Sequence, residues 1–118
     1  MSIENLAVIQ GIYYFVSGIW PLLHMGSFMK ITGPKTDQWL VKTIGILIAV
    51  IAVSLLFDAL GNEIRYSTFL LAFGSALGLT LIEIFYVAKK VISPVYLLDT
   101  VAEVILMLLW IYYIFLAT

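Results

Sequence analysis

The stretch that decides the fold is VYLLDTVAEVILMLLWIYYIFL, residues 95–116. It is apolar over about 20 residues, the length that an α-helix needs to cross roughly 30 Å of hydrocarbon. Two acids, Asp99 and Glu103, lie one helical turn apart within it. Ionisable groups inside a membrane span are costly to bury and are therefore functional candidates. The segment thus predicts both a transmembrane helix and part of a site.

Three further apolar runs precede this segment, at residues 3–28, 39–57 and 66–88. The 118 residues are 64% hydrophobic and 11% charged, with a mean hydropathy of +1.13. A soluble domain is nearer half apolar and about a quarter charged. The runs do not alternate between apolar and polar residues, which argues against a β-barrel. We therefore predict an all-α integral membrane four-helix bundle, built of two hairpins in a single domain over residues 1–118.

Small residues and one proline predict how the helices pack. The first run has Glu4 where a signal peptide has basic residues, and its Gly18 is typical of a packed helix. Pro21 should kink that helix. Gly74 and Gly78 form a GxxxG pair, for which we expect packing inside the bundle, with a homo-oligomer contact as the alternative.

Composition also excludes several classes of function. The chain has no cysteine, which excludes disulfides, thiolate metal sites and cysteine catalysis. Its net charge of −1 argues against nucleic-acid binding. We expect no cofactor. We expect the lipid bilayer as a partner, together with a small cationic or lipid ligand. The chain could also assemble as a homo-oligomer or within a larger membrane complex.

Charged residues predict the orientation of the chain. Arg65 lies alone in the second connection, beside Asp58 and Glu63. By the positive-inside rule, the first and third connections face the cytoplasm and both termini face outward. These two connections hold or adjoin five of the six basic residues: Lys30, Lys35, Lys42, Lys89 and Lys90.

Polar side chains in each run recur at i, i+3 and i+4 spacing, which places them on one face of each helix. Lipid offers no partner to polar groups, so these faces should meet inside the bundle. At 1.5 Å per residue, Glu83 lies about 9 Å inward of Lys89, and Glu103 about 15 Å inward of Ser93. We therefore predict a site in the cytoplasmic half. Its candidate ligand- or proton-binding residues come from all four helices: Glu103, Asp99, Glu83, His24, Lys42 and Tyr96.

Three neighbouring carboxylates cannot all stay ionised without compensation. Either a proton or a bound cation neutralises them, or Lys42 and a charged His24 balance them in a structural network. A metal bound by His24, Glu83, Asp99 and Glu103 would suit the chemistry of nitrogen and oxygen ligands, but no spacing here is diagnostic of one.

These residues predict binding or transport of a small cationic or protonatable ligand. One alternative is a membrane-embedded lipid- or isoprenoid-modifying enzyme of the isomerase type, with His24 and Glu103 as acid and base. Another is an accessory or structural subunit whose polar faces only set the packing. We favour a role without catalysis.

Three segments carry a resemblance: WPLLH (20–24), TGPKTDQWLVKT (32–43) and ISPVYLLD (92–99). They resemble those of a group of small uncharacterised bacterial four-span inner-membrane proteins. The resemblance implies a multi-pass protein of the bacterial inner membrane. It implies no activity.

Overall fold

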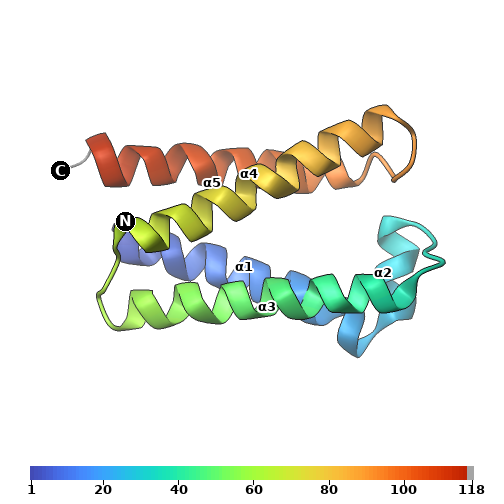
Figure 1. Ribbon diagram of the computed structural model, residues 1–118, viewed down its shortest axis with the longest axis horizontal. Helices are drawn as coiled ribbons and strands as arrows, with labels where there is room; N and C mark the ends of the chain where they lie inside the picture. Colours follow the sequence, from blue (N-terminus) through green and yellow to red (C-terminus); the bar gives the residue numbers. More distant parts are fainter. Residues whose placement is uncertain (117–118) are drawn as a thin grey trace.

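The computed structural model describes residues 1–116 as two antiparallel pairs of long helices (Figure 1). Four helices are long and apolar enough to cross a membrane, which makes this a small multi-pass membrane protein. The predicted all-α four-helix bundle is confirmed. The elements are α1 (Ile3–Leu23), the short α2 (Met25–Thr32), α3 (Gln38–Leu60), α4 (Tyr66–Ala88) and α5 (Tyr96–Ile111), which continues as the π-helical segment η1 (Tyr112–Leu116).

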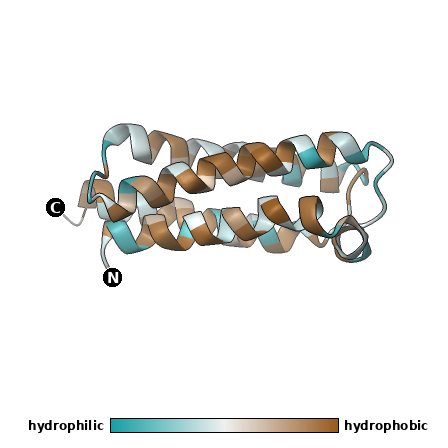
Figure 2. Ribbon diagram, turned by 90° about the horizontal axis from the view of Figure 1, so that it is seen from below, coloured by the Kyte–Doolittle hydropathy of each residue, from teal (hydrophilic) through white to brown (hydrophobic). Residues whose placement is uncertain are grey.

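The first membrane helix is shorter than the predicted run 3–28, because the chain leaves helical geometry at His24 (φ −151°, ψ 78°). Pro21, near the end of α1, has no N–H for the helix ladder, and its ring crowds the preceding turn. The His24 side chain then accepts the N–H of Ser27 and begins α2. Figures 1 and 2 show α2 lying across the end of the bundle, roughly perpendicular to the long helices.

The long helices pack mainly as two hairpins. Helix α1 lies along α3, and α4 lies along α5, whereas contacts between the two pairs are few. Both termini and the α3–α4 connection lie at one end of the bundle, and the other two connections lie at the opposite end (Figure 1). Figure 2 shows apolar residues along the helices and polar residues gathered at the connections.

Small residues bring α1 and α3 into backbone contact. A Cβ atom built on Gly18 would lie 2.4 Å from the carbonyl oxygen of Gly45, and one on Gly45 would lie 2.5 Å from that of Gly18. Ala49 and Ala52 are buried along the same face of α3. The expectation that the first helix is tightly packed is confirmed.

The expectation that Gly74 and Gly78 pack inside the bundle is wrong. Nothing lies within 4 Å of a Cβ atom built on either glycine. The buried face of α4 carries Ala72, Ala76 and Thr80. Since a step of two residues turns an α-helix by about 200°, each of these glycines lies on the face opposite its buried neighbours.

Candidate functional site

The interior divides into an apolar half and a polar half along the bundle axis. The apolar half lies toward the termini, where a cluster of buried side chains joins the start of α1, the end of α3, the start of α4 and the end of α5. Its members are Leu6, Ala7, Leu55, Ala59, Ala72, Leu106 and Trp110. The polar half lies toward the connections before α3 and before α5.

Gln10 joins three helices at the border between the two halves. The indole Nε1 of Trp110 donates to Gln10 Oε1 at 2.6 Å, and Gln10 Nε2 donates to the backbone oxygen of Ala72 at 3.0 Å. Both side chains are fully buried. This pair of hydrogen bonds connects α1 to α5 and α4, and so joins one hairpin to the other.

Two adjacent tyrosines of α1 donate to the two acids of α5. The Tyr14 hydroxyl lies 2.8 and 3.0 Å from the two carboxylate oxygens of Glu103, whose side chain is fully buried. The Tyr13 hydroxyl donates to Asp99 Oδ1. The two acids lie one turn apart on α5, and each accepts a hydrogen bond from a phenol of the other hairpin.

The third acid comes from α4. Glu83 is buried, and its Oε1 accepts a hydrogen bond from the Thr100 hydroxyl at 3.0 Å. Thr100 follows Asp99 in α5, so this bond places Glu83 beside the segment that carries Asp99. The structure therefore brings Glu83, Asp99 and Glu103 together between α1, α4 and α5. We call these three residues and their hydroxyl donors Tyr13, Tyr14 and Thr100 the carboxylate cluster.

The other predicted site residues lie outside the carboxylate cluster. His24 is exposed and caps α2, and Lys42 is exposed near the start of α3. Tyr96 lies one turn before Asp99, but its ring packs under the Lys35 ammonium, 5.2 Å from the ring centre. The predicted convergence of all five charged groups is therefore not seen.

No basic side chain of residues 1–116 pairs with the carboxylate cluster. Among residues 1–116, the only ion pair is Arg65–Glu63, at 2.9 Å in the connection at the far end of the bundle. The same residues contain no group of three or more His, Asp or Glu side chains placed to hold a metal ion. Neither a balancing network with His24 and Lys42 nor a metal site that includes His24 fits this arrangement.

The candidate site residues predicted from the sequence did not include Gln10, Tyr13, Tyr14 or Thr100. Helical phase was the available signal for Tyr14. No pattern in the sequence paired Tyr13 with Asp99, which lies 86 positions along the chain.

Comparisons of this chain with models of known protein families, with curated proteins and with solved structures find no match. The site is therefore interpreted from its own chemistry. Carboxylates accept hydrogen bonds and hold protons or cations, whereas phenols and threonine hydroxyls donate to them.

A double-mutant cycle on Tyr14→Phe and Glu103→Leu tests the contact between the two hairpins. We expect a coupling of about 1 kcal/mol, as measured for hydrogen bonds between membrane helices. The free energy of unfolding in mixed micelles provides the measurement. The matched cycle uses Tyr86→Phe with Glu103→Leu, because Tyr86 is exposed on α4, and should give no coupling. Equal coupling in both cycles would contradict the contact.

Proposed function

We propose that this membrane protein binds a small cationic or protonatable ligand at the carboxylate cluster between its two hairpins. The observation that carries the proposal is the gathering of Glu83, Asp99 and Glu103 in the bundle interior with no basic side chain paired to them among residues 1–116. A small bundle retains such groups at a cost in stability, which favours a function for them.

The charge of the cluster supports this proposal. Burying an ionised carboxylate in an apolar medium is costly unless another charge or several hydrogen bonds compensate it. Tyr13, Tyr14 and Thr100 supply hydrogen bonds, but as neutral groups they supply no positive charge. A proton or a cation at the cluster would supply that charge.

The oxygen atoms of the carboxylate cluster favour a particular kind of ligand. Ionised carboxylate oxygens accept hydrogen bonds and carry negative charge, which suits an ammonium group. The neighbouring Asp99 and Glu83 would hold the ligand directly, and Glu103 would add charge one turn deeper. Tyr13 and Tyr14 would orient the acids of α5.

Infrared difference spectroscopy on the reconstituted protein tests the proposal. Protonated buried carboxyl groups absorb at the carboxylic-acid C=O stretch, and displacement of the proton by ammonium or by tetraethylammonium removes that band. We expect Glu103→Gln to lose about half of the band change, because Glu83 and Glu103 are the two buried carboxyl groups of the cluster.

The matched control is Glu63→Gln, which makes the same substitution at an exposed carboxylate paired with Arg65. This variant should leave the band change intact. If the unmodified protein shows neither a protonated carboxyl band nor a response to either cation, the proposal is wrong.

Transport is a second candidate, favoured by the construction of the bundle. Each hairpin is closely packed within itself, whereas few contacts join the two hairpins. The carboxylate cluster lies at that boundary, where rocking of one hairpin against the other would change its access. Proton flux into vesicles containing the protein, and its loss in Glu103→Gln, would distinguish transport from binding alone.

We also propose that both termini face outward, because the connections at the opposite end of the bundle hold or adjoin five lysines, whereas the connection at the end with the termini holds one basic residue, Arg65. The resemblance of three segments to small bacterial four-span proteins supports a place in the inner membrane of a bacterium.

A further inference from the structure

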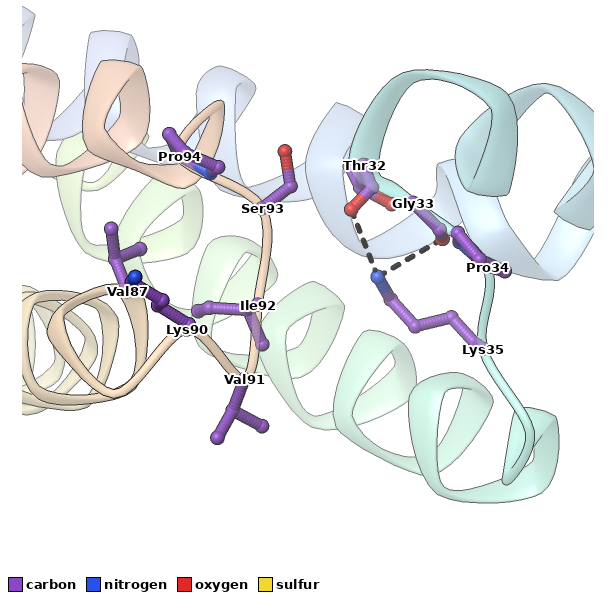
Figure 3. Close-up of a pocket in the computed structure, with 10 residues that line it drawn as sticks. All are labelled: Thr32, Gly33, Pro34, Lys35, Val87, Lys90, Val91, Ile92, Ser93 and Pro94. Atoms are coloured by element: carbon purple, nitrogen blue, oxygen red, sulfur yellow. Dashed lines mark hydrogen bonds between the residues drawn. The ribbon is translucent and has the colours of Figure 1, made fainter.

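A pocket of about 400 Å³ lies between the two connections at the lysine-rich end of the bundle (Figure 3). It lies outside the carboxylate cluster and shares no lining residue with it. One wall comes from the α2–α3 connection and the other from the end of α4 and the α4–α5 connection. The lining residues are Thr32, Gly33, Pro34, Lys35, Val87, Lys90, Val91, Ile92, Ser93 and Pro94.

The charged side chains of this pocket are all basic. Its lining holds Lys35 and Lys90, one from each connection, and no acid. Lys30 and Lys89 lie close by in the chain and add to the positive charge at this end. The pocket therefore complements an anionic group.

Lys35 is held in place by backbone oxygens and aromatic rings. Its ammonium donates to the backbone oxygens of Thr32 at 3.1 Å and Gly33 at 3.2 Å, drawn as dashed lines in Figure 3. Rings of Phe28 and Tyr96 lie 5.9 and 5.2 Å from the same nitrogen. An ammonium has three N–H donors, and these two oxygens accept from two of them.

The opposite wall is apolar apart from Lys90 and Ser93, and it lies where α4 ends. Val87, Val91 and Ile92 line it, and the side chain of Val91 is largely exposed. The pocket thus pairs lysines with an apolar surface where a membrane helix ends. A phospholipid likewise combines an anionic phosphate with apolar acyl chains, so both parts of the pocket would contact it. Free phosphate would contact only the lysines.

We propose that this pocket binds the phosphate group of an anionic phospholipid from the leaflet on that side of the membrane. Lys35 and Lys90 contact the phosphate, and the first carbons of the lipid lie against Val91 and Ile92. Basic pockets at membrane-helix ends bind anionic headgroups in this way. The inference is independent of any ligand at the carboxylate cluster.

Native mass spectrometry of the full chain in detergent, titrated with phosphatidylglycerol, tests the proposal. Each lysine near an anionic lipid contributes about five-fold in affinity, so Lys35→Gln with Lys90→Gln should weaken the first binding event about thirty-fold. The matched control removes the same charge outside the pocket, by Lys30→Gln with Lys89→Gln, and should weaken binding less than the pocket variant does, because neither lysine lines the pocket. Phosphatidylcholine should bind the unmodified protein and the pocket variant equally.

The proposal would be overturned by equal losses of lipid affinity in both double variants, or by unchanged affinity in the pocket variant. Displacement of the lipid by millimolar inorganic phosphate would also overturn it, because it would indicate a free-phosphate site. Lys35 also donates hydrogen bonds to two backbone oxygens of its own connection, so the double variant could fail to fold. Lys90→Gln alone then decides, since Lys90 makes no side-chain hydrogen bond among residues 1–116. A loss of about five-fold supports the proposal, and unchanged affinity contradicts it.

Discussion

Replacing Gly18 by isoleucine is expected to cost about 3 kcal/mol of the free energy of unfolding, at the upper end of overpacking effects. Even a Cβ atom at this position would lie 2.4 Å from the Gly45 oxygen and 2.9 Å from the Ala49 nitrogen. Both are backbone atoms, which cannot move aside as a side chain can. The two helices must therefore separate, and the hairpin loses its close contact.

Gly74→Ile is the matched control for this prediction. Gly74 also lies within a membrane helix, but nothing lies within 4 Å of a Cβ atom built there. We expect its stability to change by less than about 0.5 kcal/mol. Unfolding in mixed micelles, followed by circular dichroism, measures both. Equal stabilities of the two variants would show that α1 and α3 do not meet at Gly18.

The glycines also show how far the sequence predicted the fold. Length and hydropathy located the four membrane helices, since hydrocarbon thickness sets a minimum length for each. They could not decide which glycines are buried. Gly74 and Gly78 match a known packing motif but face outward, whereas the isolated Gly18 and Gly45 form the tight contact. Burial of a glycine depends on which helices are neighbours, and the spacing of residues within one helix does not predict its neighbours.

The same reasoning explains the partial success at the site. Depth and phase grouped Glu83, Asp99 and Glu103, and the structure places these acids along one hairpin, because α4 and α5 are adjacent in sequence. Depth also placed His24 and Lys42 at a similar level. However, the first helix ends before His24, and Lys42 lies on α3, which packs mainly on α1.

Tyr13 and Tyr14 were harder to predict for a chemical reason. A tyrosine is largely apolar surface with one hydroxyl, so it fits equally well in an apolar run, at a membrane interface or in a polar site. Their partners lie 86 and 89 positions along the chain. Only the arrangement of the two hairpins identifies these phenols as donors to buried acids.

Trp110→Ala is expected to destabilise the bundle by about 3 kcal/mol, as measured for loss of a large aromatic side chain from a core. Trp110 is 0% exposed and belongs to the apolar cluster that joins both hairpins. Its indole also donates to Gln10, which would lose the partner of its Oε1 atom. Both a cavity and an unpaired polar atom would therefore result. Chemical unfolding in micelles provides the measurement.

Two further variants separate the packing of Trp110 from its hydrogen bond. Trp39→Ala controls for loss of a tryptophan, because Trp39 is 68% exposed at the start of α3 and should contribute little to the free energy of unfolding. Trp110→Phe keeps most of the volume and removes the N–H, and should cost about 1 kcal/mol, the size of one hydrogen bond between membrane helices. If phenylalanine costs as much as alanine, the bond to Gln10 rather than the apolar contact joins the hairpins. If Trp39→Ala costs as much as Trp110→Ala, burial of Trp110 does not account for its effect.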